Sequence, residues 1–389
     1  MNKSTIWAQI LALLFLVMSI NFCSKTDDDI PNEEEEGEIS VTETQLSVGA
    51  IRWDAWYGSW VTDREEIMLA PSHFRERAPF FTQILNDSTI SINGNSQEIM
   101  TQEINFALQS GIDYWAFLTY PWFSDANGQD TELSNAATLY LNNPNKDKIN
   151  FCWIVGSHLY WYNGRWEKMV ERAMETCLMP NYQTVLNGRP LIYFYNTGIV
   201  ASDGNIRTCR RRLEKLNRDL IAAGGKEPYY VFMGWDTNNW EKAKQAGFDA
   251  WSFYAGGGAG KYADAAQQVK QSRWVLPSAK GIPIVPVVSA GWNALPRIEY
   301  NEKYSPNEEI NYSRDQICEL PTPDELASHL TEALNFTKNN ICCEAKTCII
   351  YAWNEHSEGG WLCPSITKTG GIDSSRVVAV GNVLNNYNQ

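Results

Sequence analysis

The stretch 191–233, LIYFYNTGIVASDGNIRTCRRRLEKLNRDLIAAGGKEPYYVFM, contains the repeating unit that decides the fold. It begins with an apolar, aromatic run at Leu191–Tyr195 and ends with another at Tyr229–Met233, and both runs are typical of buried parallel strands. Between them, apolar residues recur every three or four positions, as they do on the buried face of a helix. These residues are Ile206, Cys209, Leu213, Leu216 and Leu220. The stretch predicts a strand, a helix that ends at Gly224, and a second strand.

The same alternation of strand and helix continues along the rest of the chain. Six further strands are predicted at Val48–Trp53, Ile112–Leu118, Ile149–Val155, Ala250–Tyr254, Ile284–Val288 and Thr347–Ala352. Helical patterns fall between them; one ends at Gly111, and another opens with a capping box at Thr322–Glu325. Eight such units predict a single (β/α)8 barrel over residues 47–389. A doubly wound open sheet is the alternative, although no G-x-G-x-x-G sequence follows the first strand.

The predicted connections are unequal in length. The segments that follow strands 1 and 7 are long, whereas those that follow helices are short. In a (β/α)8 barrel, the active site is built from the segments that follow the carboxyl ends of the strands. The sequence therefore predicts that function lies on this rim.

The N-terminal segment resembles that of an exported lipoprotein. Residues 1–22 are predicted to be a signal peptide, because Lys3 precedes an apolar run that is short for a membrane span. Cys23 follows, as in bacterial lipoproteins, where this cysteine is lipidated; the stretch 23–29, CSKTDDD, resembles the surface-export signal of Bacteroidetes lipoproteins. Residues 23–46 are then an acidic, flexible linker. We expect a lipid anchor in the outer membrane and exposure at the cell surface; the periplasmic face, or a plain signal peptide, is the alternative.

Charge and cysteine spacing limit the partners. The net charge is −14, and much of it lies in the acidic linker. A nucleic-acid partner is not expected, because binding requires basic surface. The eight cysteines beyond Cys23 show no paired C-x-x-C spacing, so no zinc site is predicted, and we expect no metal or cofactor. The aromatic content of 12% favours either a large core or a sugar-binding cleft.

Two carboxylates directly follow the last predicted strand. Residues 354–359, NEHSEG, place Glu355 and Glu358 three positions apart beyond strand 8. Glycoside hydrolysis needs such a pair, because one group protonates the leaving oxygen while the other supplies or makes the nucleophile. Gly359 and Gly360 predict a turn, so we expect both side chains to face a cleft. The alternative is that one glutamate only caps the following loop.

This segment resembles the Asn-Glu-x-x-Glu-Gly signature of glycoside hydrolase family 99 and of the related WbsX-type proteins. The stretch 54–58, DAWYG, is similar to the Trp-Tyr-Gly opening of that family, and 107–115, ALQSGIDYW, resembles its step into the second strand. The resemblance spans most of residues 48–364. It implies a (β/α)8 barrel of a retaining enzyme that acts on α-mannosidic bonds.

The resemblance also implies a role for each glutamate. Glu355 would take the proton from the sugar 2-hydroxyl, whose oxygen would attack the anomeric carbon and form a 1,2-anhydro sugar. Glu358 would protonate the leaving oxygen and then activate water. This scheme differs from the usual retaining route through a covalent glycosyl-enzyme. The sequence departs from the family at His356-Ser357, and at Cys363, where an acid often precedes the proline.

Further rim residues are candidates for binding sugar hydroxyls or stacking on a sugar ring. They are Asp54, Trp56, Tyr57, Tyr120, Trp122, His158, Trp235, Asp236, Trp292, Asn293, Asn354 and His356. For the residues outside the signature, simple loop packing is the alternative. The run 255–261, AGGGAGK, is interpreted as a loop that lets backbone approach a sugar, because it lacks P-loop spacing. Asp113 starts strand 2 on the opposite face and is expected to be structural.

The sequence thus predicts a retaining glycoside hydrolase that cleaves α-mannoside-type linkages in an oligo- or polysaccharide. Two alternatives remain open. One is a non-catalytic, surface-exposed glycan-binding lipoprotein, against which the intact pair Glu355 and Glu358 argues. The other is a WbsX-type protein of polysaccharide assembly, against which the export signal argues.

Overall fold

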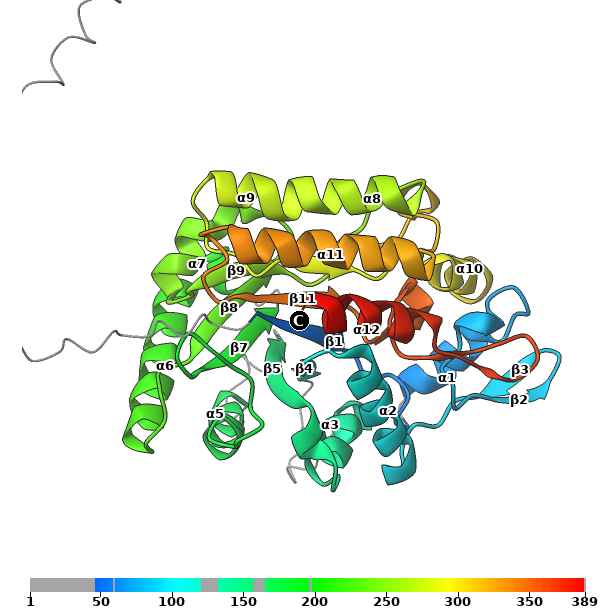
Figure 1. The fold of residues 1–389 in the computed structure, drawn as a ribbon, viewed down its shortest axis with the longest axis horizontal. Helices are drawn as coiled ribbons and strands as arrows, with labels where there is room; N and C mark the ends of the chain where they lie inside the picture. The colour runs from blue at the N-terminus through cyan, green and yellow to red at the C-terminus, as the bar shows by residue number, and fades with distance from the viewer. Residues whose placement is uncertain (1–45, 59, 120–131, 157–164, 196–197, 388–389) are drawn as a thin grey trace, which may run out of the picture. The chain divides into compact units, whose positions relative to one another are not determined.

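Eight parallel strands form the centre of the protein in a computed structural model that describes residues 46–58, 60–119, 132–156, 165–195 and 198–387 (Figure 1). The strands are β1 (Ser47–Arg52), β4 (Tyr114–Thr119), β5 (Asn150–Gly156), β7 (Arg189–Tyr195), β8 (Tyr229–Gly234), β9 (Ala250–Phe253), β10 (Val287–Ser289) and β11 (Thr347–Tyr351). Their order in the sheet is β10-β11-β1-β4-β5-β7-β8-β9. The predicted signal peptide, Cys23 and the linker up to residue 45 lie outside the described residues.

The sheet closes through the segment that precedes β10. The Trp251 N–H of β9 donates to the Pro283 carbonyl at 2.8 Å, and the Val285 N–H donates to the Trp251 carbonyl at 2.9 Å. Trp251 and Ile284 form a parallel bridge at this point. The prediction of a (β/α)8 barrel is confirmed, and the open doubly wound sheet is excluded.

Helices surround the strands on the outside (Figure 1). They are α1 (Trp60–Leu69), α2 (Gln97–Ser110), α3 (Asn135–Leu141), α5 (Arg165–Thr176), α6 (Asp203–Ala222), α7 (Trp240–Ala246), α8 (Tyr262–Val269), α9 (Leu276–Ala279), α10 (Leu295–Tyr304), α11 (Pro323–Asn339) and α12 (Ser375–Tyr387). Helix α2 ends where Gly111 adopts a left-handed conformation with φ 68°, and α11 opens with the predicted capping box, in which Thr322 and Glu325 satisfy each other's backbone N–H groups. Within the described ranges, no helix is long and apolar enough to cross a bilayer.

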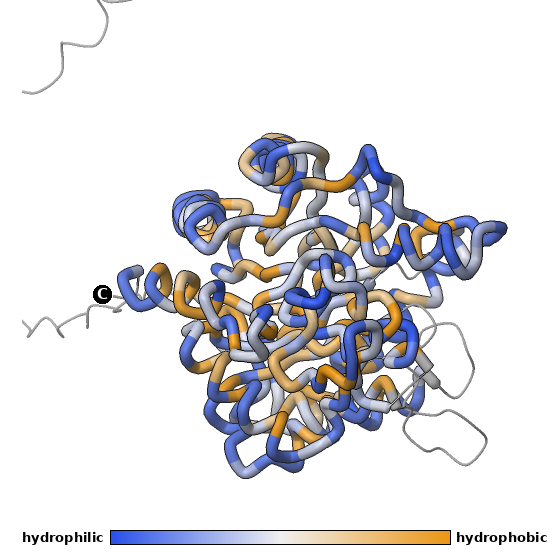
Figure 2. Tube along the Cα trace, turned by 90° about the vertical axis from the view of Figure 1, so that its right-hand side faces the viewer, coloured by the Kyte–Doolittle hydropathy of each residue, from blue (hydrophilic) through white to orange (hydrophobic). Residues whose placement is uncertain are grey.

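Large aromatic side chains fill the barrel because small residues stand opposite them. A Cβ atom on Gly49 of β1 would lie 2.2 Å from the Tyr114 ring, and one on Gly234 would lie 2.2 Å from the Trp251 ring. The buried Tyr114 hydroxyl lies 2.9 Å from that of Tyr193 on β7. Figure 2 shows apolar stretches through the interior and hydrophilic stretches mostly on the outer helices and turns.

The N-terminal end of the barrel is held by a structural carboxylate, as predicted. Asp113, just before β4, accepts a hydrogen bond from the Val48 N–H at 2.7 Å. Burial raises the pKa of Asp113 to about 6. This contact joins the starts of two neighbouring strands at the end of the barrel away from the carboxylate pair.

The long excursions lie on the opposite rim. The excursion after β1 contains α1 and a hairpin of β2 (Gln83–Asn86) and β3 (Thr89–Ser91), and the one after β10 contains α10. Helices α1 and α10 contact each other and the turn that follows β11. Short strand pairs complete the fold: β6 (Thr184–Val185) with β7, β12 (Asn354–Glu355) with β13 (Gly360–Trp361), and β14 (Ser365–Ile366) with β15 (Ile372–Asp373).

Candidate active site

The two glutamates lie on one tight turn beyond β11. Glu355 ends β12, residues 356–358 form a single 3-10 turn, and Gly359 reverses the chain with φ 82°. A Cβ atom on Gly359 would lie 2.6 Å from the Asn293 nitrogen, and the Asn293 N–H donates to the Glu358 carbonyl at 2.6 Å. The predicted turn is therefore present, and it rests against the segment that follows β10.

Glu358 accepts hydrogen bonds from three side chains. Arg297 Nη1 and the Tyr312 hydroxyl donate to its Oε1 atom, and the Tyr351 hydroxyl donates to Oε2. Glu358 is 7% exposed. Charge-assisted hydrogen bonds are strong where water is excluded, so these three donors hold the Glu358 side chain firmly in place.

Glu355 has fewer donors. The Tyr254 hydroxyl donates to its Oε1 atom at 3.0 Å, and Arg297 Nη2 lies 3.4 Å from Oε2. Burial raises the pKa of Glu355 well above its ordinary value, and the nearby charge of Glu358 raises it further, whereas Arg297 acts in the opposite direction. The surroundings of Glu355 therefore favour its protonated form.

Arg297 links the parts of the site. It lies on α10, contacts both glutamates, and donates from Nε to the Ser357 hydroxyl at 2.8 Å. Its guanidinium carbon lies 5.0 Å from the centre of the Trp53 ring. Sequence reasoning missed Arg297, because no pattern distinguishes it from a solvated helix residue. Tyr254 and Tyr351 were also missed, although their position at the ends of strands could have identified them.

A cavity of about 460 Å³ lies beside Glu358. Aromatic and polar residues line it: Tyr195, Trp235, Tyr254, Ala255, Trp292, Asn311, Tyr312 and Glu358. A neighbouring cavity of about 450 Å³ shares Trp235, Ala255 and Trp292 and is lined by Gly257 and Gly258 as well. A Cβ atom on Gly257 would lie 2.7 Å from the Trp292 ring, so the glycine-rich run does bring backbone close to the cleft wall.

Two of the predicted sugar contacts, Trp235 and Trp292, line these cavities, and Trp235 is 46% exposed. Asp236 is exposed and accepts a hydrogen bond from the Asn238 N–H in the following turn. Asn293 is buried, where it binds Arg77 and donates to the Cys318 carbonyl. Tyr120, Trp122 and His158 lie outside the described residues.

The side chain of His356, the first residue of the turn, packs against two tryptophans. The His356 ring stacks on Trp361 at 5.4 Å and meets Trp56 edge-on at 4.6 Å. Its Nδ1 atom hydrogen-bonds the Arg77 carbonyl. Burial lowers the pKa of His356 to about 3, so the ring is neutral. Neither His356 nor Trp56 lines the two cavities.

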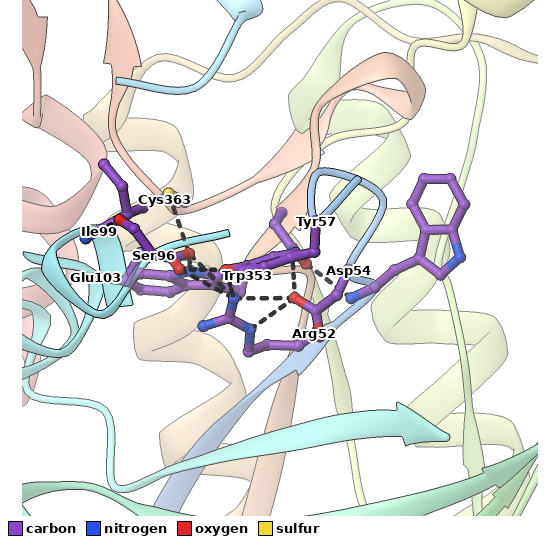
Figure 3. A network of polar contacts seen from close by, with 10 residues as sticks. Arg52, Asp54, Tyr57, Ser96, Ile99, Glu103, Trp353 and Cys363 are labelled. Carbon is purple, nitrogen blue, oxygen red and sulfur yellow. Dashed lines mark hydrogen bonds and ion pairs between the residues drawn. The ribbon is translucent and has the colours of Figure 1, made fainter. Parts of the chain in front are cut away.

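Asp54, Tyr57 and Asn354 belong to a buried network around Arg52. Figure 3 shows Arg52, Asp54 and Tyr57 in this network. The Arg52 guanidinium donates to Asp54 Oδ1 at 2.9 Å and to both carboxylate oxygens of Glu103, on α2, at 3.1 Å. The Tyr57 hydroxyl donates to Glu103 at 2.6 Å, and Asn354 Nδ2 donates to Asp54 at 3.0 Å. Burial raises the pKa of Asp54 to about 6 against the opposing effect of Arg52. These residues thus join the segment after β1 to Asn354, at the start of the turn, and their contact with sugar stays a prediction.

The described residues offer no obvious metal site. Among them, no group of three or more His, Cys, Asp or Glu side chains is arranged to hold an ion. Among the described residues, the eight cysteines from Cys152 to Cys363 form no disulfide, and Cys152 and Cys209 are buried as predicted. The expectation of chemistry without a metal stays a prediction.

Solved structures share this fold. Two structures of the family 99 endo-α-mannosidase from Bacteroides thetaiotaomicron, one of them in complex with bis-tris-propane, align with TM-scores of 0.54 and 0.53. Each is 15% identical in sequence, and each alignment covers 88% of this chain and 97% or 98% of the other. Neither a scan of protein-family models nor a search of curated proteins gives a match. The chain therefore has a barrel fold like that of glycoside hydrolase family 99.

Proposed function

We propose that this protein is a retaining glycoside hydrolase that cleaves α-mannoside-type linkages in an oligo- or polysaccharide, with Glu355 and Glu358 as its catalytic pair. The observation that carries the proposal is a pair of buried glutamates that contact one guanidinium on the rim of the barrel, beside an aromatic-lined cavity. Two solved structures that share the fold are of an endo-α-mannosidase, and residues 354–359 of this chain, NEHSEG, resemble the Asn-Glu-x-x-Glu-Gly signature of family 99.

The protonation of the pair suits the reaction. Glycosidic cleavage requires one carboxyl group that gives a proton and one that is ionised. Burial and the nearby Glu358 favour a proton on Glu355, whereas Glu358 accepts hydrogen bonds from Arg297 and Tyr351. Because the two groups interact with each other, they titrate as a unit, and the proton can change places when a substrate binds.

Two assignments of the catalytic acid and base are compatible with one proton shared by Glu355 and Glu358. In the first, which the family resemblance implies, Glu355 accepts the proton of the sugar 2-hydroxyl and Glu358 protonates the leaving oxygen. In the second, Glu355 is the acid and Glu358 is the base or nucleophile, which agrees with the raised pKa of Glu355. We propose the first, in which substrate binding moves the proton to Glu358.

The cleft can hold a sugar beside the pair. Trp235 and Trp292 present indole rings to the cavity, and flat rings cover the apolar faces of pyranoses. Three tyrosines also line this cavity: Tyr195, Tyr254 and Tyr312. A cavity of this size and mixed character is typical of small-molecule sites.

The test combines a glycan digest with two variants. The wild-type protein should release product from α-mannosidic oligosaccharides, and product analysis by NMR should show retention of the anomeric configuration. Glu355→Gln should be inactive on natural glycans and on aryl glycosides alike. Glu358→Gln should lose most activity on natural glycans, by about 10²–10⁴-fold, but less on aryl glycosides, whose leaving groups need little protonation.

Each remaining outcome has a defined meaning. If Glu355→Gln, and not Glu358→Gln, is rescued by aryl leaving groups, the roles are exchanged within the same pair. If a substrate that lacks the 2-hydroxyl is cleaved at the normal rate, Glu355 does not act through that hydroxyl. Binding of glycans without cleavage would favour a glycan-binding lipoprotein. Glu241→Gln, which removes an exposed acid on α7, serves as the control and should retain wild-type rates.

We further propose that Cys23 is acylated and holds the enzyme at the outer membrane, where it meets external glycan. The support is the order of signal peptide, cysteine and acidic linker in residues 1–46. An assembly protein of the WbsX type would act on the cytoplasmic side, so export distinguishes the two functions.

A further inference from the structure

A third buried carboxylate lies beside the catalytic pair. Glu65, on α1, is 1% exposed. Its Oε1 atom accepts a hydrogen bond from the Ser357 hydroxyl at 2.7 Å and lies 3.6 Å from Arg297 Nη2. Its Oε2 atom is buried and meets no hydrogen-bond partner among the described residues. The proposed reaction gives this side chain no role.

One guanidinium therefore serves three carboxyl groups. Arg297 contacts Glu65, Glu355 and Glu358. If all three were ionised, one positive and three negative charges would leave a net charge of −2 in a buried site. Burial of uncompensated charge is costly, so the cluster must bind protons, and each carboxylate influences how tightly the others hold theirs.

Ser357 connects the third carboxylate to the catalytic turn. It stands between the two glutamates in the sequence, donates to Glu65 and accepts from Arg297 Nε at 2.8 Å. The same short contacts therefore join α1, α10 and the 3-10 turn. A change at Glu65 reaches the pair both through this hydrogen bond and through the charge on Arg297.

We propose that Glu65 is a positioning residue for the catalytic pair: it holds Arg297 and Ser357 in place, and its charge sets how tightly Glu355 binds its proton. This inference rests on the proposed function of the pair. Burial raises the pKa of Glu65 as well, whereas Arg297 and the Ser357 hydrogen bond lower it. When Glu65 is ionised, its negative charge raises the pKa of Glu355, in addition to the larger effects of burial and of Glu358.

The other charged groups around Glu65 are few. From α10 it faces Arg297, and from the turn it faces Glu355 and Glu358. A cavity of about 240 Å³ beside Glu65 is also lined by the exposed residues Arg64 and Glu308. Strand β3, which packs on α1, carries no ionisable side chain, and the nearby His356 is neutral. Loss of the Glu65 charge should therefore act mainly on the carboxylates that share Arg297.

The decisive experiment is a titration of Glu355 in Glu65→Gln. Glutamine keeps an oxygen that accepts from Ser357 but removes the charge. In protein labelled with ¹³C at glutamate carboxyl carbons, the Glu355 signal is identified by its loss in Glu355→Gln. We expect its titration midpoint to fall by on the order of one pH unit in Glu65→Gln. Glu65→Asp keeps the charge, so its Glu355 midpoint should lie close to that of the wild type.

Activity gives a second readout. Removal of one negative charge lowers the pKa of both the acid and the base, so both limbs of the pH profile of kcat/KM should move to lower pH. Asp113→Asn is the matched control, because Asp113 is also a carboxylate with a raised pKa but lies at the opposite end of the barrel. It should leave the Glu355 midpoint and the pH profile unchanged.

The outcomes separate this inference from the proposed function. An unchanged Glu355 midpoint in Glu65→Gln, even with reduced thermal stability, would overturn the inference and leave Glu65 a structural residue. A shifted midpoint supports it whether or not a glycan substrate has been found. If the midpoint shifts but the wild-type protein hydrolyses no glycan, the proposed function fails while the coupling between the carboxylates stands.

Discussion

Substitution of Glu103 by glutamine should destabilise the barrel strongly. Glu103 is fully buried on α2, where its carboxylate accepts from Arg52, from the Tyr57 hydroxyl at 2.6 Å and from Trp353 Nε1 at 2.9 Å. Every one of these partners is a donor. A glutamine amide removes the negative charge and also presents an NH₂ group to a set of donors, so at least one buried donor loses its acceptor.

The expected cost follows from these contacts. Arg52 is 0% exposed and keeps Asp54 as its remaining anion. Removal of one partner from a buried ion pair typically costs about 3–5 kcal/mol. The retained Asp54 reduces that cost, whereas an orphaned Tyr57 or Trp353 donor adds about 1–3 kcal/mol. We therefore expect a loss of about 3–5 kcal/mol in the free energy of unfolding.

Urea unfolding followed by tryptophan fluorescence measures this loss. Glu98→Gln is the matched control, because Glu98 lies on the same helix but is exposed, and it should cost less than about 1 kcal/mol. Arg52→Met in the Glu103→Gln background tests whether the two effects are coupled. A loss below about 1 kcal/mol for Glu103→Gln would refute the reasoning, since Arg52 would then need no second anion.

Four further predictions concern the cleft, the pH dependence of stability, the chemistry and the anchor. Gly257→Ala should raise KM for glycans several-fold with the fold intact, because its Cβ atom would meet the Trp292 ring at 2.7 Å; an unchanged KM would remove this wall from the binding site. Burial raises the pKa of Asp113 from 3.8 to about 6. The folded state therefore binds more protons between these values, and unfolding free energy should fall as pH rises from about 4 to 6. Asp113→Asn, whose amide oxygen can still accept from the Val48 N–H, should lose this part of the slope in urea unfolding curves taken across that range. Hydrolysis should survive a chelator, and loss of activity that zinc or calcium restores would contradict chemistry without a metal. Cys23→Ala should leave the membrane fraction on fractionation; if it remains there, the anchor lies elsewhere.

The strands were predictable because burial on both faces leaves a continuous apolar run. The predicted strand Tyr229–Met233 matches β8 (Tyr229–Gly234) to within one residue. The predicted strand Ile284–Val288 matches less well, since β10 begins at Val287. Pro283 and Pro286 lack the N–H groups that a continuous ladder needs, so only a bridge forms at Ile284.

The site could be predicted only where its reactive side chains stand close together in the sequence. Glu355 and Glu358 stand in one short segment, so their pairing is visible without a structure. Arg297 and Glu65 reach them from α10 and α1, and a charged residue on a helix has the same sequence pattern whether it is solvated or buried. The contact predicted between Asp54 and sugar stays a prediction, whereas its contact with Arg52, which in turn binds Glu103 on α2, could not be foreseen from the sequence.

The difference in environment between Glu355 and Glu358 is likewise set by the tertiary structure. Two equivalent carboxylates three residues apart give no sequence reason to prefer one. The fold directs Arg297, Tyr312 and Tyr351 at Glu358 and leaves Glu355 with Tyr254 and a longer contact to the same guanidinium. A substrate hydroxyl that donates to Glu355 would stabilise its ionised form and drive the proton toward Glu358. The proposed mechanism therefore requires the 2-hydroxyl of the sugar to displace the proton that the surroundings of Glu355 favour.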